Sequence, residues 1–126
     1  MESKEVQINN EESILDYVKK ILGIQKEYTH FDPDVIYGIN AAFAVLTQLN
    51  VGPEGGFSIS DDSTKWNEFI QDTARLSLVK EYVCLRTRLL FDPPTSAALI
   101  DVMNKSIAEY EWRLFIASDG GESQNG

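Results

Sequence analysis

Residues 82–96 read YVCLRTRLLFDPPTS, and they contain the end of one helix and the beginning of the next. Pro93 and Pro94 cannot continue a helix, because neither has an N–H to donate and each ring crowds the preceding turn. Thr95 and Ser96 then offer hydroxyl groups to the free N–H groups of a new helix. The stretch therefore predicts two long helices that fold back on each other.

Apolar residues recur at helical spacing on both sides of this stretch. The helix before it is predicted to begin at Asp72 or Thr73, after a short helix that carries Trp66 and Phe69 and is capped by residue 63 or 64. The helix after it is predicted over residues 96–116, with small residues at 97 and 98 allowing close helix approach. Its predicted core stripe is Ile100, Met103, Ile107, Tyr110 and Leu114.

Two further helices are predicted upstream. Asn9 or Asn10 is the predicted N-cap of the first, and Gly23 is its predicted C′ residue. Asp32 is the predicted N-cap of the second, with Pro33 at its first position, where a missing N–H costs nothing. The predicted fold class is therefore all-α, a small four-helix bundle-like domain.

The chain has 126 residues, which favours a single domain. We expect a flexible N-terminus over residues 1–10, a helical domain over residues 11–116, and a disordered tail over residues 117–126, which is rich in Gly, Ser, Asn and Gln. No apolar run is long enough to span a membrane, and the polar start has no signal-peptide pattern.

A long segment rich in Gly, Ser and Asp separates the second and third predicted helices. It exceeds the usual length of a connection, and such segments tend to be functional or disordered. Apolar and polar side chains alternate over residues 57–60, which is compatible with a short strand or hairpin arm there. The residues singled out as a channel or contact loop are Gly52, Pro53, Glu54, Gly55, Gly56, Phe57, Asp61 and Asp62.

The net charge of −9 and the isoelectric point near 4.5 argue against non-specific binding to DNA or to anionic membranes. The single cysteine, Cys84, lies on a helical apolar pattern and is typical of a buried residue in a reduced compartment. One histidine, His30, cannot form a catalytic triad or a zinc site with one cysteine. We therefore expect no enzyme activity, no metal and no cofactor.

Cations gather on the third predicted helix, at Arg75, Lys80, Arg86 and Arg88. Four cations in an acidic chain are a weak nucleic-acid footprint. Arg86 and Arg88 are instead expected to pair with carboxylates, either inside the bundle or across an interface. Trp112 and Arg113 are of types favoured at interface centres, although a core position for the tryptophan is equally compatible.

Several pieces of the chain together resemble the head–tail connector (adaptor or head-completion) proteins of tailed bacteriophages and prophages. The resemblance rests on RLLFDPPTS at residues 88–96, EYEWRL at 109–114, FDPDVI at 31–36, LNVGP at 49–53, and GFSI at 56–59 ahead of Trp66 and Phe69. It covers roughly residues 12–116. The order and spacing of these pieces together carry the resemblance.

The resemblance implies a structural virion protein that forms a ring, typically of about twelve copies, below the portal. Such a ring joins head to tail, extends the DNA channel without binding DNA specifically, and receives a downstream head-completion or tail protein. It implies location in the virion and, during assembly, in the host bacterial cytoplasm.

On this interpretation, two further sets of residues have expected roles. The expected subunit interface comprises Arg75, Arg86, Arg88 and Trp66. The expected portal contact comprises Trp112, Arg113, Phe115 and Ile116. The alternative function is a free-standing acidic helical binding protein, either a DNA mimic or a small phage regulator, which would concentrate its charge on one surface.

Overall fold

The computed structural model describes the backbone of residues 11–125 and the side chains of residues 11–118. Its elements are α1 (Ile14–Leu22), α2 (Asp32–Gln48), the short 3-10 helix η2 (Trp66–Glu68), α3 (Thr73–Phe91) and α4 (Ala97–Asn125). Over residues 11–125 there is no strand, only an isolated bridge between Ser13 and Lys65. The all-α prediction is confirmed, and the predicted flexible segment 1–10 lies outside the described residues.

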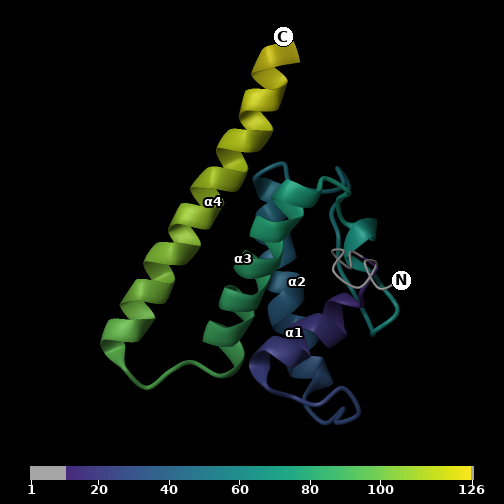
Figure 1. Ribbon diagram of the computed structural model, residues 1–126, viewed down its shortest axis with the longest axis vertical. Coiled ribbons are helices and arrows are strands. Elements are labelled where there is room, and N and C mark those ends of the chain that lie inside the picture. The colour runs from purple at the N-terminus through teal and green to yellow at the C-terminus, as the bar shows by residue number, and fades with distance from the viewer. Residues whose placement is uncertain (1–10, 126) are drawn as a thin grey trace, which may run out of the picture.

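The three longer helices are stacked side by side. α3 and α4 run antiparallel and are joined by the turn at residues 92–96, while α2 packs against the other side of α3 (Figure 1). α1 packs against both α2 and α3. The C-terminal end of α4 extends beyond the other helices (Figure 1).

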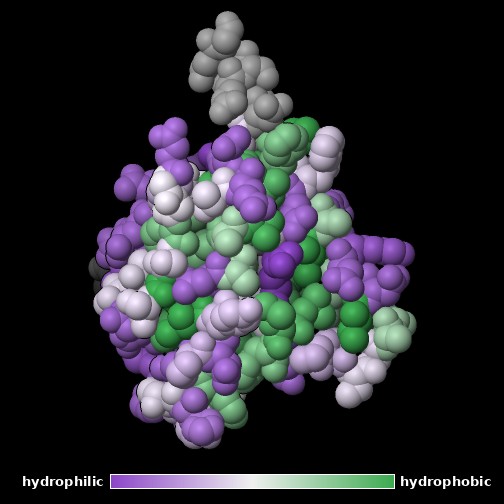
Figure 2. All heavy atoms as spheres, turned by 180° about the vertical axis from the view of Figure 1, so that it is seen from behind, coloured by the Kyte–Doolittle hydropathy of each residue, from purple (hydrophilic) through white to green (hydrophobic). Residues whose placement is uncertain are grey.

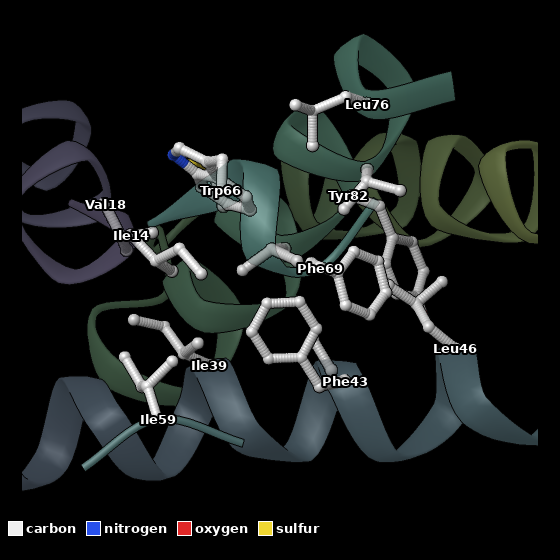
Figure 3. Packing of buried hydrophobic residues seen from close by; sticks show 14 of the residues in the cluster. Ile14, Val18, Ile39, Phe43, Leu46, Ile59, Trp66, Phe69, Leu76 and Tyr82 are labelled. Carbon is white, nitrogen blue, oxygen red and sulfur yellow. The ribbon is translucent and has the colours of Figure 1, made fainter. Parts of the chain in front are cut away.

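The core lies between α1, α2, η2 and α3. Phe43 on α2, Trp66 in η2 and Phe69 just after it converge there with aliphatic side chains from α1 and α3 (Figure 3). The Phe43 and Phe69 ring centroids are 4.7 Å apart, and the Trp66 indole meets Tyr17 edge-on at 5.6 Å. Buried aromatic rings such as Phe43 and Trp66 supply a large share of the apolar surface removed from water.

The turn between α3 and α4 forms as its sequence predicts. Asp92 ends α3, and Ser96 precedes α4, accepting a hydrogen bond from the N–H of Leu99 at 3.2 Å. α4 is longer than predicted, since it continues past residue 116 to Asn125. The expected disorder of residues 117–126 stays a prediction.

Two of the predicted helix caps are wrong. Ser13, not Asn9 or Asn10, caps α1, because the chain pairs with residues 64–66 just before the helix begins. The N-cap position of α2 is held by Phe31, and the carboxylate of Asp32 instead pairs with Lys19 at 2.8 Å. The predicted Gly23 end of α1 is confirmed, with a left-handed φ of 83°.

Lys19 is a buried cation, with only 1% of its surface exposed. Besides pairing with Asp32, its ammonium group donates hydrogen bonds to the carbonyl groups of Lys26 at 3.0 Å and Tyr28 at 2.7 Å. Three acceptors compensate for the lost hydration of the charge. Lys19 therefore ties the connection between α1 and α2 to the body of the domain.

α4 is held less tightly than the other helices. Of its predicted core stripe, only Ile107 and Leu114 are buried, and the other three members are half-buried. The reason is that α4 packs chiefly on α3. Ala97 and Ala98 are exposed, so the expectation that they allow close packing of helices within the chain is wrong.

Candidate interaction surfaces

The segment between α2 and α3 is fixed to the body at several points. Val51 and Ile59 are buried, and the Phe57 ring packs against Phe43 and Phe69, with centroids 5.0 Å from each. Gly52 has a φ of 91° and lies directly on the Phe69 ring, where a Cβ would come within 2.3 Å of Phe69 Cε1. Only glycine combines this backbone conformation with such a close approach.

The strand that residues 57–60 were expected to form is absent. Instead, the side chain of Asn40 on α2 pairs with the backbone of Ile59, accepting from its N–H at 2.8 Å and donating to its carbonyl at 2.9 Å. The amide thus supplies both hydrogen bonds that a neighbouring strand would have supplied. The segment is extended at this point without belonging to a sheet.

The solvent-facing side of this segment is acidic. Glu54, Asp61 and Asp62 are exposed, together with Gly55, while Pro53 and Gly56 are half-buried. Asp61 accepts hydrogen bonds from the Ser63 hydroxyl at 2.6 Å and from the Ser63 N–H at 2.9 Å, which lower the pKa of the Asp61 carboxyl. These bonds favour the ionised form of Asp61.

The residues predicted for the subunit interface do not form one surface. Trp66 is fully buried in the core and is therefore removed from the predicted interface. Arg86 pairs with Glu111 on α4 at 3.4 Å, and Glu111 also accepts a 2.7 Å hydrogen bond from the Tyr82 hydroxyl. Of the two arrangements expected for Arg86, the one inside the bundle occurs.

The other two cations differ in their exposure. Arg88 is exposed near the end of α3, where its Nε donates to the carbonyl of Asp92 at 3.3 Å. Arg75 is half-buried near the start of the same helix. They are far apart on α3, so they do not join in a single cationic patch with Arg86.

The residues predicted for the portal contact lie together on α4. Trp112 is 62% exposed, Ile116 is 43% exposed and Phe115 is 37% exposed. The rings of Trp112 and Phe115 are 6.4 Å apart, and Arg113 is exposed beside them in a pair with Glu109 at 2.8 Å. A core position for Trp112, which the sequence left open, is therefore wrong, and the large ring is presented to solvent.

A second apolar surface was not predicted from the sequence. Between α1, α3 and α4 lies a groove of about 270 Å³ lined by the apolar residues Ile21, Cys84, Leu85, Leu99 and Met103. The charged residues Glu81 and Arg88 also line it. One sequence signal for it was that Leu99 lies directly beside Ile100 of the predicted core stripe, and another was that Leu85 widens the apolar face of its helix. On the face turned away from Figure 1, apolar atoms form a broken band between polar margins (Figure 2).

Cys84 and His30 are the two side chains that the sequence offered for catalysis. Cys84 is buried, and burial raises the pKa of its thiol to about 12, which leaves no reactive thiolate at neutral pH. His30 is exposed before α2, where its ring lies 4.8 Å from that of Phe31. Over the described residues, no cluster of three or more His, Cys, Asp or Glu side chains could hold a metal ion. Nor is any described helix long and apolar enough to cross a membrane.

One of the comparisons with known proteins found a match. The family described as "Phage connector protein" matches residues 14–121, a range that takes in all four α-helices apart from the last residues of α4. No curated protein and no solved structure matches the chain. Because the match covers most of the sequence and runs across every packed element of the domain, the chain belongs to the phage connector protein family.

Proposed function

We propose that this protein forms a ring below the phage portal, joins the head to the tail and lengthens the channel through which DNA passes. The family match over residues 14–121 is the observation that carries the proposal. A structural head–tail connector role follows from the family, whereas the ring, its place below the portal and its neighbours are the proposed part. The protein would enter the virion after assembly in the bacterial cytoplasm.

The charge of the chain suits a channel that DNA must slide through. With −9 per chain, a ring of about twelve copies carries on the order of −100 before screening by counterions. Residues 50–74 hold five carboxylates and one lysine, and Glu54, Asp61 and Asp62 among them are exposed. We place this segment at the bore, where negative charge repels phosphate groups and prevents DNA from being held.

An exposed stretch of α4 suits contact with another virion protein. Aromatic residues and arginine are enriched in the buried centres of protein interfaces, and Trp112, Arg113, Phe115 and Ile116 are presented together on α4. We assign this region to contacts with neighbouring proteins, with the portal as the first candidate. A downstream head-completion or tail protein would then bind elsewhere on the ring.

The test is electron microscopy of the purified full-length chain mixed with its cognate portal ring. Added density below the portal, with rotational symmetry, is the expected result. Chains that stay unbound to the portal contradict the proposal. If such chains also bind a basic partner, the free-standing acidic binder becomes the better function.

A further inference from the structure

We infer that the Trp112–Phe115 pair of one copy docks into the apolar groove of a second copy of this chain. The aromatic pair is the two rings on α4, and the apolar groove is the hollow lined by Ile21, Leu85, Leu99 and Met103. The inference rests on the proposed function, because it names the contact by which neighbouring subunits join. It reassigns the aromatic pair from the portal to the next copy.

The groove has the size and chemistry of an aromatic site. Its volume of about 270 Å³ exceeds the ~150 Å³ of a cavity that accepts a benzene ring. Leu99 remains 47% exposed and Ile21 50% exposed, so apolar surface there is still open to solvent. Burying an exposed indole against these side chains removes apolar area from water on both partners.

The two surfaces also carry complementary charges. Glu109 and Arg113 lie beside the aromatic pair, and Glu81 and Arg88 are among the residues that line the groove. Each surface thus offers one positive and one negative charge to the other. Such complementarity fixes the orientation of docking more than it adds affinity. It favours a copy of this chain over an uncharged apolar partner as the occupant.

The positions of the two surfaces on α4 determine the kind of assembly. Leu99 and Trp112 are separated by about 20 Å along the helix and by about 140° around it, at ~1.5 Å and ~100° per residue. A copy therefore cannot place its aromatic pair in its own groove. Because the two surfaces lie on different sides of α4, one docked contact leaves a free groove on one copy and a free aromatic pair on the other. This is a head-to-tail contact, which forms a ring when the rotation between successive copies closes and an open filament when it does not.

The first test compares self-association of the full-length wild-type chain with single variants by sedimentation velocity over a concentration series. Trp112→Ser removes the aromatic ring, and Leu99→Glu places a charge in the groove. Each is expected to weaken association at least tenfold. Leu99→Glu also places a glutamate three residues after Ser96, a favourable capping arrangement, and circular dichroism of the variant checks that it is folded. Tyr37→Ser, at an aromatic residue 71% exposed on α2, is the control and should leave association unchanged.

The decisive test mixes the two variants. Trp112→Ser chains keep an intact groove and Leu99→Glu chains keep an intact aromatic pair, so the mixture should form one-to-one pairs with wild-type affinity and should not extend further. A mixture that stays monomeric overturns the inference. So does a wild-type chain that shows no self-association, or variants that assemble as the wild type does.

Portal binding is scored separately on the same proteins. Trp112→Ser monomers that still bind the portal, without joining one another, would support both the inference and the proposed function. Wild-type chains that self-associate by this contact but do not bind the portal would support the inference and contradict the proposed function. The two failures are therefore distinguishable.

Discussion

Gly52 is a single residue on which the whole connection between α2 and α3 depends. Gly52→Ala is expected to destabilise the fold by about 2–4 kcal/mol, because the backbone is left-handed there and the new Cβ would collide with the Phe69 ring. Urea unfolding measures the change. Gly55→Ala is the matched control, since a Cβ there meets nothing within 4 Å, and it should change stability by less than about 0.5 kcal/mol. Equal effects of the two substitutions would contradict the proposed packing.

Cys84 predicts a dependence of stability on alkaline pH. Burial raises the pKa of its thiol from 9.0 to about 12, so the folded state holds the proton more tightly than the unfolded state. The stability from this group is complete below about pH 9. It is lost as the pH rises from 9 towards 12, at up to ~1.4 kcal/mol per pH unit.

The measurement is urea unfolding of the wild type and of Cys84→Ala at several pH values. As the pH rises above about 9, the free energy of unfolding of the wild type should fall relative to that of Cys84→Ala. Taking the difference removes the contribution of Tyr82, whose pKa is also raised. Parallel pH profiles would show that the thiol titrates alike in both states.

The helix starts that could be predicted are those set by local chemistry. The two prolines, Ser96 and the Asp72 cap act within a few residues of themselves, and α3 and α4 begin where these residues place them. The caps of α1 and α2 could not be predicted in this way. Ser13 is positioned by pairing with a segment about fifty residues away, and Asp32 is drawn to a lysine on another helix.

The surfaces were harder to predict than the helices. Periodicity placed Leu114 in the core correctly, but it could not tell that α4 packs on α3 and leaves Trp112 in solvent. Trp66 was expected at the subunit interface, yet it is fully buried in the core. Residue type alone does not separate these two tryptophans, because both environments favour a large apolar ring.

α4 depends on few buried residues, and this makes its attachment testable. Leu114→Ala should cost about 2–4 kcal/mol, because Leu114 is fully buried where α4 meets the body. Leu99→Ala, on the same helix but 47% exposed, should cost less than about 1 kcal/mol. Thermal unfolding followed by circular dichroism measures both. A small effect of the first substitution would mean that α4 is free of the body.

For the whole molecule, the acidic segment predicts an effect on DNA passage. Replacing both Asp61 and Asp62 with lysine should leave the fold intact, because both side chains are exposed, and should impair DNA retention or ejection in assembled phage. Nuclease protection of packaged DNA and infectivity are the measurements. Lysine at both Glu27 and Asp34 makes the same change in charge at other exposed positions and is the control. Normal infectivity of the first variant would contradict placing this segment at the bore.

The anchoring of the α2–α3 connection has a practical consequence. Between the buried Val51 and the packed Phe57, only a short exposed bend around Gly55 is free of the core. Lengthening such a bend adds little to the entropic cost of closing the loop during folding. A peptide epitope inserted after Gly55 should therefore be accepted without loss of folding. A bound antibody fragment would then mark, in images of the particle, whether this edge of the subunit points inward or outward.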